Sequence, residues 1–229
     1  MKKINQSLFL FLALSIAACR DQGPSLDIEP DFQSNVRFDQ PAVGQTSRYI
    51  RFEGGSCPTP FIGFAYLPDT LVLEVNKVEG ETVTLTERLT PNSACVKTTD
   101  PYDDPWGGGV AAITLKLRIT KDSARVLEIS GPFNQSRLFS FPDLAMPLAP
   151  ISSPEVALES WYPGNSGYLA THQQLGVFYD HLNAVTYSTP MAWDGTGGLY
   201  IYTAGLGMVR SGHRNGWCQQ GEGWDLLPE

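Results

Sequence analysis

Residues 112–120, AITLKLRIT, carry the clearest signal of the fold, because apolar and polar side chains alternate there without interruption. On an extended strand, Ile113, Leu115, Leu117 and Ile119 would point to one face, and threonine, lysine and arginine to the other. A period of two is typical of a strand with one buried face and one solvated face, as in antiparallel sheets. The segment therefore predicts a sheet that packs against a core on one side.

Similar but shorter segments lie on both sides of this stretch. Residues 71–76 and 82–86 alternate in the same way, and Glu79-Gly80-Glu81 between them predicts a hairpin. Pro68-Asp69 predicts a turn before residue 71. Further predicted strands, each bounded by turn residues, are Tyr49–Phe52, Phe61–Tyr66, Arg125–Ser130, Arg137–Phe141, Leu175–Tyr179, Ala184–Ser188, Leu199–Thr203 and Met208–Arg210.

One short segment has the residues of a helix start. In Ser153-Pro154-Glu155, serine suits the N-cap and proline the first helical position, but Pro163-Gly164 would end such a helix after about two turns. The four prolines between Pro142 and Pro154 favour an extended crossing loop. We therefore expect an all-β protein with at most one short helix. The expected form is a curved antiparallel sheet or partly closed barrel, lipocalin-like or lipoprotein-carrier-like, with a sandwich as the alternative.

The composition agrees with this fold class and argues against nucleic acid as a partner. Of the 229 residues, 22 are glycine and 17 proline, and only 17% are charged, which favours strands and turns over long charged helices. The net charge of −8 disfavours nucleic-acid binding, which needs lysine and arginine to neutralise phosphates.

The N-terminus has the features of a secretory signal. Lys2-Lys3 precede an apolar run from Leu8 to Leu14, and small residues then lead into Cys19. The apolar run is shorter than the roughly 20 residues that span a bilayer, so a permanent transmembrane helix is disfavoured.

The four residues Ile16-Ala17-Ala18-Cys19 resemble the lipobox of bacterial lipoproteins. The resemblance covers residues 1–19 only. It implies removal of a signal peptide, residues 1–18, attachment of diacylglyceryl to the Cys19 thiol, and acylation of the new amino terminus, for example by palmitate. The processing and sorting machinery for lipoproteins and the membrane itself are the implied partners. An ordinary secretory signal followed by a coincidental cysteine is the alternative interpretation.

The resemblance also bears on where the protein resides. Arg20, and not an aspartate, follows the lipidated residue. Under the sorting rule of enteric-type bacteria this implies the outer membrane of the cell envelope. Residues 19–47 then form the lipidated cysteine and a tether, and residues 48–229 a single β-rich domain; Phe32, Val36 and Phe38 are the tether residues that could dock on the domain.

Three cysteines remain once Cys19 carries lipid, and an oxidising compartment favours one disulfide and one free thiol. Cys57 with Cys95 is the preferred pair, because both lie in turn-rich segments. Three strands predicted between them place the two cysteines at opposite ends of a meander, which argues against that pair. Cys218 could replace either partner.

The acidic run around Asp100, Asp103 and Asp104 is the best candidate for a polar site. Carboxylates on a loop could bind Ca²⁺, although the spacing does not match the Asp-x-Asp-x-Asp-Gly loop and a solvated loop is the commoner explanation. Tyr102 and Trp106 on this loop could instead contact a sugar or a partner protein.

The sequence contains only partial matches to catalytic motifs. Ser166 could form a triad with His172 or His181 and Asp180, but the G-x-S-x-G pattern is absent. No zinc, phosphate-loop or dinucleotide motif occurs, so the sequence predicts no cofactor. We therefore expect a binding or interaction module, not an enzyme, whose ligand is a small molecule, a glycan or an envelope protein. A secreted hydrolase is the alternative.

Overall fold

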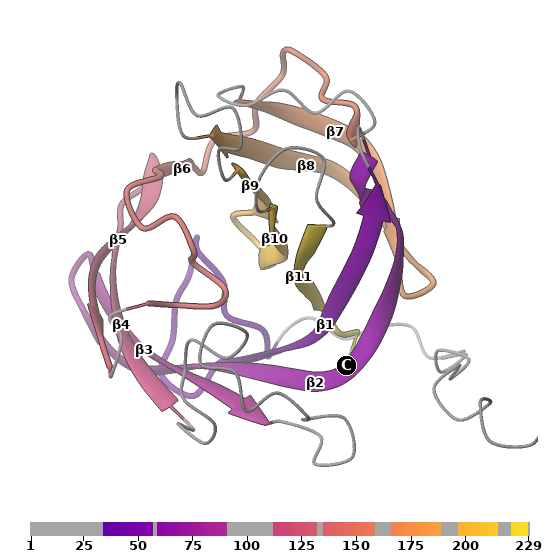
Figure 1. The fold of residues 1–229 in the computed structure, drawn as a ribbon. Coiled ribbons are helices and arrows are strands. Elements are labelled where there is room, and N and C mark those ends of the chain that lie inside the picture. Colours follow the sequence, from indigo (N-terminus) through magenta and orange to yellow (C-terminus); the bar gives the residue numbers. More distant parts are fainter. Residues whose placement is uncertain are drawn as a thin grey trace, which may run out of the picture.

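The computed structural model describes residues 34–56, 59–90, 112–131, 135–158, 166–188, 197–214 and 221–228. These residues form one eleven-stranded sheet in which all neighbouring strands are antiparallel and which curls into a half-barrel (Figure 1). The described part of the chain contains no α-helix. The predicted all-β class, with a curved sheet as a partly closed barrel, is thus confirmed.

The strands have the following bounds: β1 (Thr46–Ser56), β2 (Thr59–Glu79), β3 (Thr82–Thr90), β4 (Ala112–Ile119), β5 (Ser123–Ser130), β6 (Met146–Pro147), β7 (Ser166–Gln174), β8 (Val177–Ser188), β9 (Gly197–Thr203), β10 (Gly207–Arg214) and β11 (Gly221–Leu226). Their order across the sheet is β6-β5-β4-β3-β2-β1-β11-β10-β9-β8-β7. Each half of the sheet is therefore a meander of consecutive hairpins.

The two halves meet where β1 pairs with β11. This ladder runs from Tyr49 opposite Leu226 to Gly54 opposite Gly221. All other neighbours in the sheet follow each other in the chain. One long-range ladder therefore decides whether the two meanders form one sheet.

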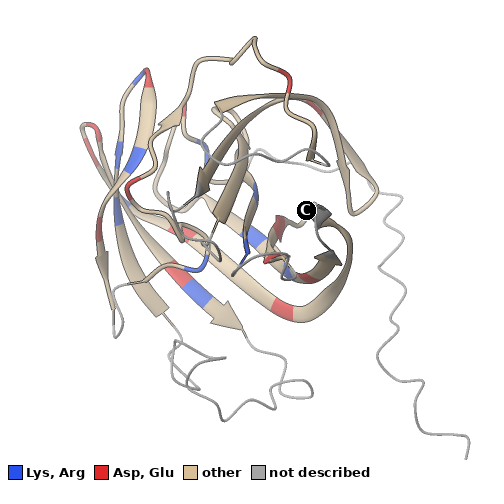
Figure 2. Ribbon diagram, turned by 45° about the horizontal axis from the view of Figure 1, so that its top comes forward, with Lys and Arg blue, Asp and Glu red and all other residues tan. Residues whose placement is uncertain are grey.

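The concave face of the sheet holds the larger hydrophobic core. The four apolar residues of β4 all point into it and are at most 8% exposed, as their alternation predicts. The opposite face of β3 to β5 is solvated and carries cross-strand ion pairs such as Lys116 with Glu128. Figure 2 shows charges of both signs interspersed along the strands.

A second core lies on the other face of the closing strands. Along β9, Leu199 and Ile201 belong to this second cluster, whereas Tyr200 and Tyr202 belong to the first. Residues of β1, β2, β7, β8 and β10 complete the second cluster: Phe52, Phe61, Leu169, Tyr179, Leu182, Ala184 and Val209. Strand β9 is thus buried on both faces, which explains its near-continuous run of apolar residues.

The segment 135–151, here called the crossing segment, lies across the space that the sheet encloses (Figure 1). Its side chains Leu138, Phe139, Met146 and Leu148 are buried in the larger core. The prediction of a strand at Arg137–Phe141 is therefore wrong: these apolar residues pack into the core without joining a ladder. The extended crossing loop predicted from the prolines is present, with only the two-residue strand β6 inside it.

Two other local expectations differ from the structure. Strand β2 continues through Pro68-Asp69, where a turn was expected. In the described residues 153–158 no α-helix follows Ser153, and Glu155 instead bridges to Tyr168 of β7. Val36 and Phe38 are only 1% exposed, so these two residues of the expected tether do dock on the folded body.

The strands alternate in direction, so their ends gather at two opposite ends of the sheet. The tether end, as we call it, holds the start of β1 at Thr46 and the short turns β2–β3, β4–β5 and β9–β10. The loop end holds the connections β1–β2, β3–β4, β8–β9 and β10–β11. Three of the loop-end connections, 91–111, 189–196 and 215–220, are longer than the turns at the tether end, whereas the β1–β2 connection has only residues 57–58.

We predict that Gly223→Ala severely destabilises the protein. Gly223 lies in β11 between β1 and β10, and a Cβ there would approach the Ser211 carbonyl oxygen to 2.1 Å. Backbone crowding of this kind should cost about 1–3 kcal/mol or more. Thermal unfolding checks this, with Gly205→Ala as the control because its nearest atom is 4.0 Å away. Equal unfolding midpoints for the two variants would contradict the tight packing at this ladder.

Candidate functional site

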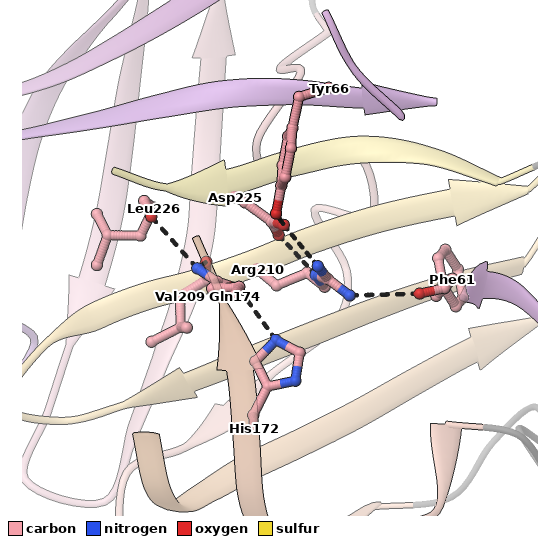
Figure 3. A network of polar contacts seen from close by, with 8 residues as sticks. All are labelled: Phe61, Tyr66, His172, Gln174, Val209, Arg210, Asp225 and Leu226. Carbon is pink, nitrogen blue, oxygen red and sulfur yellow. Dashed lines mark hydrogen bonds and ion pairs between the residues drawn. The ribbon is translucent and has the colours of Figure 1, made fainter. Parts of the chain in front are cut away.

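A buried ion pair joins the last two strands of the chain. Arg210 of β10 and Asp225 of β11 lie directly opposite each other and are 2% and 0% exposed. The guanidinium donates from Nε to Oδ1 and from Nη2 to Oδ2 of the carboxylate, both at 2.5 Å (Figure 3). This is a bidentate, charge-assisted contact, the strongest kind of hydrogen-bonded pair in proteins.

Residues from β1 and β2 enclose the guanidinium. The Arg210 Cζ atom lies 4.8 Å from the ring centroids of both Phe52 and Phe64. Its Nη1 atom donates to the Phe61 carbonyl oxygen at 3.4 Å, and the Tyr66 hydroxyl donates to Asp225 Oδ2 at 2.8 Å. The aromatic faces and these polar contacts together replace the water that the charges lose on burial.

The network affects the ionisation of its members. Burial works against the charged form of Arg210, but the Asp225 carboxylate outweighs it and raises the pKa of the guanidinium. Burial, followed by the charge of Asp225, raises the pKa of the Tyr66 hydroxyl. Arg210 therefore stays charged and Tyr66 stays a hydrogen-bond donor at any ordinary pH.

Strand β7 contributes the other side of the network. The Gln174 amide donates to the carbonyl oxygens of Val209 and Leu226 at 3.1 and 3.3 Å, and its Oε1 lies 3.0 Å from His172 Nε2. Burial, together with the charge of Arg210, lowers the pKa of His172 to about 4. His172 is therefore neutral near pH 7 and adds no positive charge beside Arg210.

These contacts give the network a role in holding the fold. It links β10 and β11 to β2 through Tyr66 and to β7 through Gln174, four strands that do not all neighbour one another in the sheet. Loss of one member of a buried charge pair leaves the other uncompensated, which is costly. The network thus fixes how the edge strand β7 and strand β2 pack around β10 and β11.

A second buried carboxylate holds the crossing segment. Glu87 of β3 is fully buried and accepts hydrogen bonds from the Ser136 hydroxyl at 2.5 Å and the Arg137 backbone N–H at 2.8 Å. Burial raises the pKa of Glu87, and the bonds from Ser136 and Arg137 oppose that rise. The crossing segment is therefore attached to the sheet by a specific polar contact as well as by its apolar side chains.

Asn183 of β8 holds the far part of the same segment. Its amide nitrogen donates to the carbonyl oxygens of Pro147 and Ala149 at 2.9 and 3.0 Å, and its Oδ1 accepts from the Ile151 N–H at 2.9 Å. Glu87 and Asn183 lie in opposite halves of the sheet. The crossing segment therefore bridges the two halves through the interior.

A more exposed charged cluster lies near the loop end. Glu222 of β11 accepts from Arg51 Nη2 at 2.8 Å and lies 2.9 Å from His213 Nε2. Asp69 approaches Arg51 from β2 at 3.6 Å. The contact with His213 and the charge of Arg51 lower the pKa of Glu222 to about 2. Glu222 is thus ionised throughout the physiological range.

The structure does not bring the candidate triad residues together. Ser166 and His172 both lie on β7, six residues or about 20 Å of strand apart. Asp180 and His181 are exposed on β8, whereas His172 is buried and bonded to Gln174. The arrangement that the hydrolase alternative requires is therefore missing among these four residues.

The other sequence candidates lie outside the described residues: Cys19, Cys57, Cys95, Cys218, Asp100, Asp103 and Asp104. Within the described ranges, no three histidine, cysteine, aspartate or glutamate side chains are grouped so as to hold a metal ion. No helix in those same ranges is long and apolar enough to cross a membrane.

Sequence reasoning missed the buried polar residues Arg210, Asp225, Glu87 and Asn183. A signal was present for one pair: Arg210 follows Met208-Val209, and Asp225 stands between Trp224 and Leu226, so each is a charge in an apolar strand. Glu87 gave a similar signal, because the alternation of Val83 and Leu85 continues to Glu87 and so places this carboxylate on the buried face of β3.

The sequence matches no protein-family model, and no curated protein is significantly similar to it. Among solved structures, a protein of Bacteroides fragilis that is thought to be exported and has a YmcC-like fold matches with a TM-score of 0.40 and 13% identity. The match covers 83% of this chain and 97% of that one.

We predict that Arg210→Met and Asp225→Asn each lower the free energy of unfolding by about 3–5 kcal/mol, because each leaves one buried partner uncompensated. The double variant Arg210→Met/Asp225→Asn should lose much less than the sum of the two single effects. Chemical denaturation measures all three, with Lys116→Ala of an exposed ion pair as a control that changes little. Additive losses would show that the pair does not act as a unit.

Proposed function

We propose that this protein is a lipid-anchored protein of the bacterial cell envelope whose β domain acts as a binding or interaction module. The sequence Ile16-Ala17-Ala18-Cys19 behind an apolar run supports the anchor, and Arg20 supports the outer membrane as its location. Diacylglyceryl and an amide-linked acyl chain give more than one lipid chain, which is what stable anchoring requires.

The start of the folded body supports an orientation for the anchored protein. Residues 34–45 lie at the tether end, where Phe38 N–H donates to the Ala204 carbonyl oxygen at 2.8 Å and Gly44 N–H to that of Val75 at 2.9 Å. Fourteen residues separate Cys19 from Ser34, at most about 50 Å of extended chain. A chain from a lipidated Cys19 would then enter the domain at the tether end, which is opposite the loop end.

The occupied interior of the half-barrel is the observation that carries the proposed mode of action. In a carrier, a ligand would lie against the concave face, but here the crossing segment packs Leu138, Phe139, Met146 and Leu148 against it. Glu87 and Asn183 hold that segment from both halves of the sheet. We therefore infer that binding takes place on the outside of the domain, and not in its interior.

The loop end is the surface that we assign to the partner. The connection between β3 and β4 contains Asp100, Asp103 and Asp104, and it begins and ends at the loop end. Loops held by a rigid sheet are where binding residues are most often found. A glycan, a small polar molecule or another envelope protein fits such a surface, and the negative net charge argues against nucleic acid.

We predict that Cys19→Ser abolishes incorporation of labelled fatty acid and prevents signal removal by the lipoprotein pathway, because only a thiol can form the thioether. Metabolic labelling and the intact mass of the membrane-extracted protein measure this. Cys95→Ser serves as the matched control and should keep the label. A label that persists in Cys19→Ser would refute the anchor.

We also predict that a soluble chain starting at Arg20 does not bind a fluorescent phospholipid or fatty acid in its interior. The crossing segment fills the positions that such a ligand would need. Titration should show no saturable binding, and the unfolding midpoint should not rise with the concentration of the lipid. A saturable, concentration-dependent rise in the midpoint would instead identify a lipid carrier.

A further inference from the structure

The turn between β7 and β8 has an apolar tip that the folding of the hairpin does not require. Gln174 pairs with Val177, so Leu175 and Gly176 form a two-residue turn, with φ of 50° and 79°. Such turns prefer asparagine, aspartate or glycine at the first position, because a bulky side chain is strained at positive φ. Leu175 is only half-buried, and it belongs to neither core cluster of the described residues. Neither the turn nor the core therefore explains this leucine.

Phe178 extends the apolar tip on its outer side. Its side chain is 69% exposed, whereas the neighbouring Val177 packs against the second core. Among the described residues, the only other large apolar side chain that is more than half exposed is Val43, at 65%. Single exposed apolar residues are common on protein surfaces, so the position of these two decides what they indicate.

Both exposed side chains lie at the tether end. Strands β7 and β9 are each antiparallel to β8, so the β7–β8 turn lies at the same end of the sheet as the β9–β10 turn. The Gln174 amide donates to the Leu226 carbonyl oxygen at 3.3 Å, and Leu226 lies opposite Tyr49 near the start of β1. Val43 belongs to residues 34–45 at this end. A chain from a lipidated Cys19 would enter the domain at the same end.

We propose that the tether end rests on the lipid surface that holds the anchor, with Leu175 and Phe178 inserted at the level of the headgroups and Val43 as a second contact. This inference rests on the lipid anchor of the proposed function and adds an orientation to it. The anchor alone leaves up to about 50 Å of chain and does not orient the domain. Two apolar contacts on one end would orient it, because burying them in lipid is favourable.

The charges around the tip are compatible with a phospholipid surface. Residues 173–179 contain no charged side chain, and Asp180 is the nearest acid in the hairpin, two residues beyond Phe178. Arg48 is exposed at the start of β1, and a guanidinium suits the phosphate of a headgroup. Acids of the neighbouring turn are compensated in part, as in the ion pair of Lys77 with Glu79 at 2.8 Å. The contact should therefore depend on apolar burial more than on salt.

The anchor would make so small a contact effective. A few inserted side chains do not hold an unanchored chain on a membrane, since even a single acyl chain binds only marginally. Once the anchor is inserted, contact of the tip with the same surface is an intramolecular step with a high effective concentration. The tip therefore orients the anchored domain and does not replace the anchor.

The test uses the lipidated protein, extracted from membranes and reconstituted in vesicles of phosphatidylethanolamine and phosphatidylglycerol, with or without brominated acyl chains. Phe178→Trp places a fluorescent probe at the tip, and Ile62→Trp is the matched control, exposed near the loop end. The emission of the unchanged protein is subtracted from both. Brominated chains should remove most of the emission added by Phe178→Trp and leave that of Ile62→Trp unchanged. Equal quenching of the two probes, or no quenching of Phe178→Trp, overturns the proposal.

A second arm separates this inference from the anchor itself. A chain from Arg20, which contains every described residue, is held on vesicles by a histidine tag at its N-terminus and a nickel-chelating lipid. The same selective quenching is expected. Mature protein without acyl chains contradicts the proposed function, whereas an unquenched Phe178→Trp on the chelating vesicles overturns the orientation. A blue shift of Phe178→Trp emission that grows with protein concentration, without vesicles, would assign the tip to a second copy and also overturn it.

Discussion

The pairing of β1 with β11 holds the two halves of the sheet together. Each half of the sheet is a meander whose contacts are local in sequence, whereas this ladder joins Tyr49–Gly54 to the last strand of the chain. The β10–β11 hairpin places Asp225 opposite Arg210, and the β1–β11 ladder brings Phe52 beside the guanidinium. Forming a long-range ladder costs the conformational entropy of closing a loop of most of the chain. It therefore needs more stabilising interactions than a local hairpin needs.

Buried polar contacts fix the position of the crossing segment, which hydrophobic packing alone would allow in several arrangements. Apolar side chains pack in many arrangements, but a buried carboxylate such as Glu87 is satisfied only when Ser136 and Arg137 lie beside it. The Asn183 amide is likewise satisfied only when the backbone of residues 147–151 lies within hydrogen-bonding distance. The crossing segment thereby takes one position within the half-barrel. Because it fills the interior in that position, the outer surface is left for a partner.

The two ends of the half-barrel differ in a way that suits an anchored protein. The tether end combines short turns with the packed residues 34–45, so the chain from a lipidated Cys19 would arrive at the compact side of the domain. The longer connections leave from the opposite end, close to the charged cluster around Glu222. The proposed anchor at one end and the longer connections at the other would form a simple geometry for reaching a partner away from the membrane.

The all-β class and the inward face of strands such as β4 could be predicted from the sequence, because alternation is a local property, and the proposed N-terminal signal likewise rests on a short local motif. Only the tertiary structure decided that β2 runs through Pro68-Asp69, that Arg137–Phe141 fills the interior, and that Val36 and Phe38 belong to the body. The same apolar run can join a ladder or fill a core, and pattern alone does not distinguish the two. Arg210 and Asp225 became a site only when folding placed residues from β1, β2 and β7 around them.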